Sequence, residues 1–223
     1  MKTEETVERV VPGTRSWELY GYEHLQRYLF VKEFIKDKNV LDAACGSGYG
    51  SYFMATEGNA KSVTGIDISE TAIEHCHKYQ NSNLNYRVID CMQLSNLKEK
   101  FDIVISFETV EHLSDPRDFF RKVSEILIPG GIFICSTPNK QRLSGAGNIN
   151  PFHPSELSYD EFKNLFKLEF TIKNEFHQSE TISYSRYMEL KHLLSKVSGR
   201  ASAYFLNRIE NKMREAVGKN FVY

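Results

Sequence analysis

Residues 40–50 read Val-Leu-Asp-Ala-Ala-Cys-Gly-Ser-Gly-Tyr-Gly, and they are the strongest indication of the fold class in this chain. Its two leading apolar residues are typical of a buried strand, which runs through Asp42 into a turn with almost no side chains. The glycines Gly46, Gly48 and Gly50 allow a ligand to approach the backbone closely. The first N–H groups of the following helix would then face that ligand. The stretch therefore predicts a strand, a ligand-binding turn and a helix, in that order.

The spacing of the glycines and the acid before them indicate the kind of ligand. Dinucleotide enzymes place G-x-G-x-x-G at such a turn, whereas this chain has G-x-G-x-G preceded by Asp42. A carboxylate beside the turn would repel a pyrophosphate group but would suit an ammonium group. The pattern points away from NAD and towards a cationic cofactor that carries an amino acid.

These features resemble the first motif of the class I S-adenosylmethionine (SAM)-dependent methyltransferases, and further matches follow in order over residues 38–140. The resemblance implies that Asp67, which lies 25 residues after Asp42, holds the ribose hydroxyls, close to the roughly 20-residue interval of a ribose-binding acid. It also implies that Asp90 accepts a hydrogen bond from the adenine amino group. An unrelated nucleotide-binding α/β domain is the alternative. The implied SAM site comprises Asp42, Ala44, Gly46, Gly48, Tyr49, Asp67, Ile68, Asp90, Cys91, Met92 and Phe107.

Strand and helix patterns alternate along the chain at the spacing of βα units. We therefore expect an α/β fold that is doubly wound and Rossmann-like, with a mostly parallel seven-stranded sheet and helices on both faces. Residues 1–37 are expected to form an N-terminal helical lid and residues 38–180 the SAM-binding core. Residues 181–223 are expected to form a C-terminal helical extension packed on the core or on a partner subunit. Within the core we expect a helix from Ser158 to about Phe166, then a strand over residues 168–172.

A second group of polar residues follows the expected fourth strand, where residues 107–113 read Phe-Glu-Thr-Val-Glu-His-Leu. Ligands of open α/β sheets bind beyond the carboxyl ends of the strands. In a helix, Glu108, Glu111 and His112 would stand at positions i, i+3 and i+4 and share one face. Carboxylates beside an imidazole suit a divalent cation such as Mg²⁺ or Mn²⁺. His153, in the loop after the fifth strand, is a fourth candidate.

The E-x-x-E-H arrangement resembles that of the metal-dependent O-methyltransferases of ubiquinone biosynthesis and of the small-RNA 3′-end 2′-O-methyltransferases. The resemblance implies that Glu108, Glu111, His112 and His153 are metal ligands, and that vicinal hydroxyls of the acceptor chelate the metal. The metal would lower the pKa of the attacking hydroxyl as a Lewis acid. Two alternatives stay open: a metal-free histidine base, or a purely structural role for the glutamates and histidines. Glu111, His112 and His153 are the candidate catalytic residues.

A looser resemblance covers nearly the whole chain and concerns residues 8–13, 21–28, 136–139 and 150–153. These segments look like those of small bacterial methyltransferases that accompany glycosyltransferases. The resemblance implies that the acceptor hydroxyl belongs to a sugar, a nucleotide sugar or a glycan. A sugar diol also satisfies the metal chemistry described above.

The chain has 223 residues and a net charge of −1, so its overall charge does not indicate a polyanionic partner. Residues 186–219 are basic, which would suit RNA, but their apolar residues recur at helical spacing. We therefore favour a helix pair that packs on the sheet or forms a homodimer, and we do not expect nucleic acid as a partner. No apolar run approaches the roughly 18 residues of a membrane span. Four cysteines without a C-x-x-C pair indicate reduced thiols and a cytoplasmic protein.

Three kinds of function remain open from the sequence. The leading hypothesis is an enzyme, a SAM-dependent methyltransferase that O-methylates a small acceptor such as a sugar or another diol. The second is an RNA 2′-O-methyltransferase, for which E-x-x-E-H is the main support. The third is a non-catalytic, SAM-binding subunit of a larger assembly.

Overall fold

The computed structural model describes residues 9–140 and 152–178. The described residues divide into two compact units, of which one holds Arg9, residues 31–140 and residues 152–172, and the other holds residues 10–30 and 173–178. The larger unit contains the sheet and all the candidate site residues. The division into lid, core and extension stays a prediction, and the helices expected at 181–223 lie outside the described residues.

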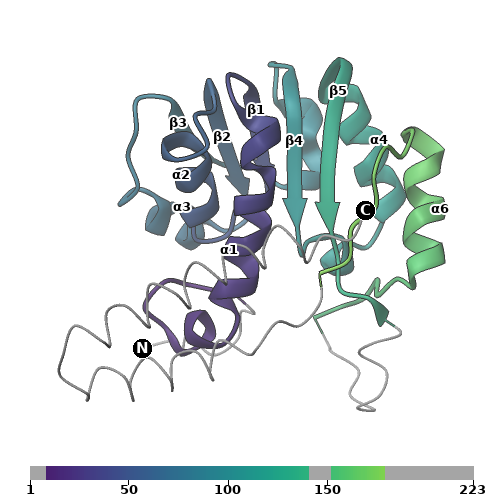
Figure 1. Cartoon of the computed structure of the whole chain (residues 1–223), viewed down its shortest axis with the longest axis horizontal. Helices are drawn as coiled ribbons and strands as arrows, with labels where there is room; N and C mark the ends of the chain where they lie inside the picture. Colours follow the sequence, from purple (N-terminus) through teal and green to yellow (C-terminus); the bar gives the residue numbers. More distant parts are fainter. Residues whose placement is uncertain (1–8, 141–151, 179–223) are drawn as a thin grey trace, which may run out of the picture. The chain divides into compact units, whose positions relative to one another are not determined.

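The larger unit is built on a parallel sheet (Figure 1), which confirms the expected Rossmann-like α/β fold. Within the described residues the sheet has five strands in the order β3-β2-β1-β4-β5, so the expected seven strands are not confirmed. Every neighbouring pair is parallel. The strands are β1 (Asn39–Ala43), β2 (Ser62–Asp67), β3 (Leu84–Val88), β4 (Phe101–Phe107) and β5 (Leu127–Ser136).

The strand order creates a reversal point between β1 and β4. From β1 the chain moves outward through β2 to β3 and then returns to β4, on the other side of β1. The connections that follow β1 and β4 therefore leave the sheet in opposite directions. A crevice for a ligand forms beyond the carboxyl ends of the strands at such a point.

Helices cover both faces of the sheet, as the sequence predicts. Successive strand residues point to opposite faces, so Leu41 packs in the core formed with α4 (Pro116–Ile126), whereas Asp42 meets Ser51 of α2 (Tyr49–Thr56). The short helix η2 (Cys91–Asn96) packs beside α4. On the α2 side, α3 (Glu70–Cys76) contacts β2 and β3.

The strand expected at residues 168–172 is wrong, because α6 (Tyr159–Glu169) continues through the first two of them and the described residues 170–178 form no strand. Phe162 and Phe166 are spaced four apart in α6, which places them on one helical face, and Phe170 follows as the C-cap residue. All three rings pack against Phe120 of α4, with centroid distances of 6.2, 4.7 and 6.4 Å. This aromatic packing favours helix over strand for the segment.

Polar side chains fix the helix starts that the sequence predicts. Ser69 caps α3 by accepting a hydrogen bond from the Ala72 amide, and Ser158 forms a capping box with Glu161 at the start of α6. Pro116 stands in the first turn of α4. These caps set where each connection beyond the sheet turns back into a helix.

The smaller unit includes most of α1 (Arg15–Ile35) and residues 173–178. Gln178 donates hydrogen bonds to the main-chain oxygen of Glu23 and to the side chain of Gln26, at 3.0 and 2.9 Å. The rings of Phe30 and Phe176 pack edge to face, with centroids 4.6 Å apart. No helix among the described residues has the length and apolar character to span a membrane.

Candidate active site

The turn between β1 and α2 requires glycine at one position and leaves open space at another. Gly48 has a φ of 80°, and a Cβ there would lie 2.5 Å from the Cys76 sulfur and 3.0 Å from the Tyr86 hydroxyl. Tyr86 donates a hydrogen bond to the Gly48 carbonyl at 2.8 Å. Gly46 also has a positive φ of 56°, but nothing lies within 4 Å of a Cβ built there. The turn is therefore packed against the protein at Gly48 and open to a ligand at Gly46.

Two carboxylates flank this turn at the ends of β1 and β2. Asp42 is 1% exposed, and its Oδ2 accepts a hydrogen bond from the Ser51 hydroxyl at 2.5 Å. Burial raises the pKa of Asp42 to about 7, with a smaller contribution from the charge of Asp67 and against the effect of the Ser51 hydrogen bond. The Asp67 carboxylate accepts hydrogen bonds from the main-chain amides of Gly46 and Ser69, at 3.0 and 2.9 Å.

Arg9 is a contact of Asp67 that sequence reasoning missed. Its guanidinium forms an ion pair with Asp67 Oδ1 at 3.1 Å and donates to the Ser69 hydroxyl at 3.1 Å. The ion pair is partly buried, with side-chain exposures of 25% for Arg9 and 7% for Asp67. A sequence pattern does not relate residues so far apart, because only the folded chain brings them together.

The other expected cofactor residues follow β2, β3 and β4. Ile68 is 67% exposed directly after Asp67, and the Asp90 carboxylate caps η2 by accepting from the Met92 amide at 2.8 Å. Asp42, Asp67 and Asp90 thus stand at or just beyond the carboxyl ends of three adjacent strands. The residues placed at this edge after β1, β2 and β3 are Asp42, Ala44, Gly46, Gly48, Tyr49, Asp67, Ile68, Asp90, Cys91 and Met92, and Phe107 ends β4.

Glu108 does not join the other polar residues that follow β4. The chain after β4 forms a helical turn only over η3 (Val110–His112), so the continuous helical face expected from Glu108 to His112 does not form. Glu108 precedes the turn in a left-handed conformation, with φ 52°. Its carboxylate accepts a hydrogen bond from the Ser136 hydroxyl of β5 at 2.6 Å.

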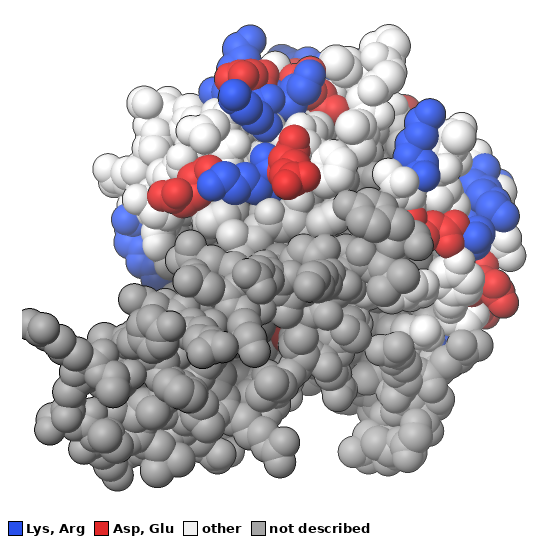
Figure 2. Space-filling view, viewed as in Figure 1, with Lys and Arg blue, Asp and Glu red and all other residues white. Residues whose placement is uncertain are grey.

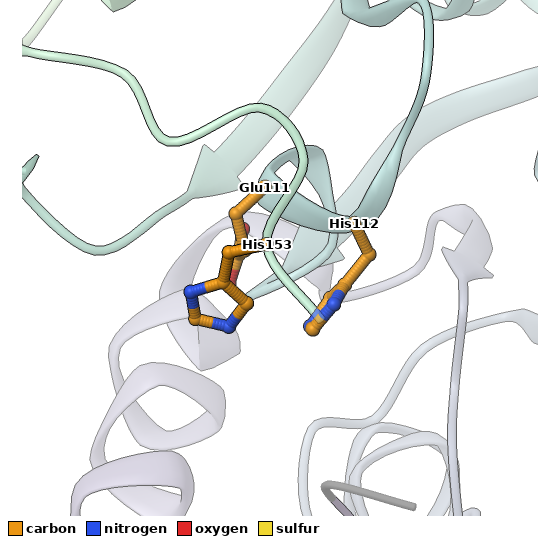
Figure 3. Close-up of side chains that lie close together, drawn as sticks. All are labelled: Glu111, His112 and His153. Atoms are coloured by element: carbon orange, nitrogen blue, oxygen red, sulfur yellow. The ribbon is translucent and has the colours of Figure 1, made fainter. Parts of the chain in front are cut away.

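Glu111, His112 and His153 do come together (Figure 3), and one potential ligand atom from each lies within 4.8 Å of the others. The two imidazole rings pack edge to face, with centroids 4.8 Å apart. Glu111 is 1% exposed and accepts a hydrogen bond from the Thr137 hydroxyl at 2.9 Å. One buried carboxylate therefore meets two imidazoles that come from different segments.

The loop over residues 152–156 carries His153 to this cluster and is itself bonded to η3. The Ser155 amide donates to the Glu111 carbonyl at 3.1 Å, and the Ser155 hydroxyl donates to the Leu113 carbonyl at 2.6 Å. His112 Nδ1 bonds the Phe152 carbonyl at 2.8 Å. His153 Nδ1 bonds the Glu156 carboxylate at 3.1 Å. The sequence predicted only His153 from this loop.

A carboxylate and two imidazoles support two kinds of chemistry. Mixed oxygen and nitrogen donors fit a divalent transition-metal or magnesium-type cation, and an imidazole is also the usual side chain for proton transfer near neutral pH. The donor set Glu111, His112 and His153 therefore fits both the metal-assisted and the metal-free hypotheses. Glu108 is outside the set.

Comparisons with known proteins show which families the chain is similar to. A family model described as a methyltransferase domain matches residues 41–135. A probable SAM-dependent methyltransferase of Mycolicibacterium smegmatis is 30% identical over 165 residues, which cover 73% of this chain and 63% of the relative. A ubiquinone biosynthesis O-methyltransferase of Coxiella burnetii is 31% identical over 185 residues, which cover 70% of this chain and 78% of the relative. The match thus spans less than two thirds of the mycobacterial relative.

Solved structures share the fold at low sequence identity. A putative methyltransferase from Bacillus halodurans has a TM-score of 0.61 and 17% identity, and the match covers 81% of this chain and 87% of that one. The N-methyltransferase NodS from Bradyrhizobium japonicum, in complex with S-adenosyl-L-homocysteine, has a TM-score of 0.58 and 19% identity, with coverages of 72% and 80%. This likeness shows the fold, and the relatives at 30% and 31% identity, together with the methyltransferase family model, show that the chain belongs to the class I SAM-dependent methyltransferases.

Proposed function

We propose that this protein transfers the methyl group of SAM to a hydroxyl of a small acceptor such as a sugar, a nucleotide sugar or a glycan. The observation that carries the proposal is the cluster of Glu111, His112 and His153. It stands beyond β4, the neighbour of the strand that leads into the glycine turn. A hydroxyl must lose its proton during methyl transfer, and the cluster offers groups that take a proton or bind a cation.

The relatives support oxygen as the methylated atom. The Coxiella relative is an O-methyltransferase by name, at 31% identity, whereas NodS is an N-methyltransferase by title at 19% identity, which supports the fold alone. The sugar part of the proposal comes from the resemblance of residues 8–13, 21–28, 136–139 and 150–153 to methyltransferases that accompany glycosyltransferases.

In this proposal the acids of the sheet edge hold SAM. Asp67 accepts hydrogen bonds from the ribose hydroxyls and Asp90 from the adenine amino group. Asp42, buried behind the turn, favours the positive charge of the cofactor. Ile68 would cover the adenine, since its side chain is exposed at the end of β2.

Glu111, His112 and His153 would hold Mg²⁺ or Mn²⁺ if a cation takes part. When bound there, the cation would supply Lewis-acid chemistry that lowers the pKa of the acceptor hydroxyl. The alternative within the proposal is that an imidazole takes the hydroxyl proton directly. Glu108 was expected as a fourth ligand, but its carboxylate bonds Ser136, so we assign it to holding the end of β5.

Neither the net charge of the chain nor the described part of the face in view favours an RNA acceptor. The net charge of the chain is −1, and Figure 2 shows basic and acidic side chains intermixed among the described residues of the face in view. A nucleic-acid-binding surface would present clustered positive charge. A homodimer formed through the C-terminal helices and a cytoplasmic location remain predictions from the sequence.

The decisive experiment follows the label of methyl-tritiated SAM into a panel of acceptors, with and without chelator. We expect transfer to a sugar hydroxyl of a nucleotide sugar or glycan. Transfer to RNA 3′ ends or to amines instead would overturn the small-hydroxyl proposal. Tight SAM binding with no turnover on any acceptor would indicate a non-catalytic subunit.

Calorimetric titration of Mn²⁺ into the SAM-saturated protein, with His153→Ala as the control, decides whether a cation binds at the cluster.

Replacing Arg9 is expected to strengthen SAM binding. The Arg9 guanidinium pairs with the Asp67 carboxylate, which in the proposal accepts hydrogen bonds from the ribose hydroxyls. The ion pair therefore competes with the cofactor. A partly exposed ion pair contributes about 0.2–1 kcal/mol, and Arg9→Ala should therefore lower the Kd for SAM by up to about fivefold. Calorimetry on wild type and variant measures this change. A higher Kd in the variant would show that Arg9 contacts the cofactor rather than competing with it.

The affinity for SAM is expected to rise with pH up to about pH 7. The Asp42 pKa of about 7 means that this carboxyl is largely protonated in the free protein at lower pH. A cationic cofactor favours the ionised form, so binding releases a proton, and the association constant should rise by up to about tenfold per pH unit below that pKa. Calorimetry between about pH 5.5 and about pH 7, in buffers of different ionisation enthalpy, measures the SAM affinity and the proton released on binding. In Asp42→Asn the pH dependence should disappear, and its persistence would assign it to another group.

A further inference from the structure

One short loop engages the Nδ1 atoms of both histidines in the cluster. His112 Nδ1 bonds the Phe152 carbonyl at 2.8 Å, and His153 Nδ1 bonds Glu156 Oε1 at 3.1 Å. A carbonyl oxygen and an ionised carboxylate oxygen only accept hydrogen bonds. Both Nδ1 atoms must therefore carry the proton, and in a neutral imidazole this leaves the lone pair on Nε2.

The two histidines differ in what holds them. The partner of His112 is a main-chain carbonyl, which any residue at position 152 would supply. The partner of His153 is the side chain of Glu156, so that one side chain determines which ring nitrogen of His153 carries the proton. The His153 side chain is 8% exposed and that of Glu156 is 22% exposed, so the bond is partly shielded from water.

Groups other than the Glu156 side chain hold the loop over residues 152–156 against η3. Ser155 contributes its amide to the Glu111 carbonyl and its hydroxyl to the Leu113 carbonyl. These two bonds tie the loop to η3 without the Glu156 carboxylate. The interaction of Glu156 with His153 can therefore be removed while the main anchors of the loop remain.

We propose that Glu156 is a positioning residue, whose carboxylate holds the Nδ1–H tautomer and the orientation of His153 and so presents Nε2 as the reactive or ligating atom. Carboxylates that accept from the second nitrogen of a histidine play this part in many metal and catalytic sites. The inference rests on the proposed function only for the use made of Nε2. The assignment of the tautomer to Glu156 stands on the geometry alone.

The test is ¹⁵N NMR of histidine-labelled, chelator-treated protein, which identifies the protonated nitrogen of each ring. The wild type is expected to show the Nδ1–H tautomer at His153, and Glu156→Ala should lose that preference. Glu156→Gln keeps an oxygen that accepts from Nδ1 and should restore it. The His112 signal is the internal control, because a main-chain carbonyl holds that ring in all three proteins. An unchanged His153 tautomer in Glu156→Ala would overturn the proposal.

Kinetics supply a second readout that separates positioning from loop stability. In Glu156→Ala we expect kcat to fall by about 10- to 100-fold, with the KM for SAM and the Tm nearly unchanged, and Glu156→Gln should recover most of the loss. Ser155→Ala, which removes one of the loop anchors, should instead lower the Tm. A loss of Tm in Glu156→Ala and Glu156→Gln equal to that in Ser155→Ala would show that Glu156 has a merely structural role. Wild-type turnover in His153→Ala would refute the proposed function of the cluster, while the NMR result would still decide the role of Glu156.

Discussion

Gly48→Ala is expected to lower the free energy of unfolding by about 2–5 kcal/mol. A left-handed conformation costs an L-residue about 1–2 kcal/mol, and Gly48 has a φ of 80°. An added methyl group would also stand 2.5 Å from the Cys76 sulfur and 3.0 Å from the Tyr86 hydroxyl, and overpacking of this kind costs about 1–3 kcal/mol more. Urea denaturation, with the midpoint and slope compared to wild type, measures the change.

Gly46→Ala is the matched control for this prediction. Gly46 has a φ of 56°, but a Cβ there meets nothing within 4 Å. This variant should therefore lose only the conformational part, about 1–2 kcal/mol. A loss at Gly46 equal to that at Gly48 would mean that the packing against Cys76 and Tyr86 contributes nothing.

Glu111→Gln is expected to reduce turnover by about 10²- to 10⁴-fold, the range for loss of a group that acts in proton transfer. Glutamine keeps an oxygen that accepts from the Thr137 hydroxyl, so the local structure should persist, but the negative charge beside His112 and His153 is lost. In the proposed function other residues of the sheet edge hold SAM, so the Kd for SAM should change little. Single-turnover methyl transfer together with SAM calorimetry separates the two effects.

Glu108→Gln is the matched control for the cluster. Its carboxylate bonds Ser136 and stands outside the three-residue set, so this variant should keep far more activity than Glu111→Gln. Equal losses in the two variants would favour the four-ligand arrangement expected from the sequence. Wild-type turnover in Glu111→Gln would reduce the cluster to a structural role.

The glycine turn and the strand and helix on either side of it could be predicted because their signals are local. Asp42 and the glycines lie within one strand–turn–helix unit, and the Ser69 cap of α3 lies two residues after Asp67. The residues of such a short segment largely determine its backbone conformation. For the same reason the parallel sheet followed from the alternation of strand and helix patterns along the chain, whereas the order of its strands comes from the structure.

The contacts that the sequence did not reveal join residues far apart in the chain. Arg9 meets Asp67, and Thr137 meets Glu111, because the sheet brings distant segments to one edge. The expected helical face from Glu108 to His112 failed for a different reason. Periodicity alone does not show that the chain leaves β4 through a left-handed residue before it turns.

Positive φ values at Ala44 (65°) and Glu108 (52°) have a consequence for engineering this chain. Among the described residues, the other non-glycine positions of this kind are Asp37 and Asn59, whose residue types tolerate the conformation well. Ala44 and Glu108 instead directly follow the two central strands, at the edge that carries the polar groups. A redesign that aims at thermostability alone would place glycine or asparagine at both positions, and at position 108 it would also discard the carboxylate that bonds Ser136. Improved stability with impaired turnover in such a redesign would mark the left-handed residues as sites where function and stability make opposing demands.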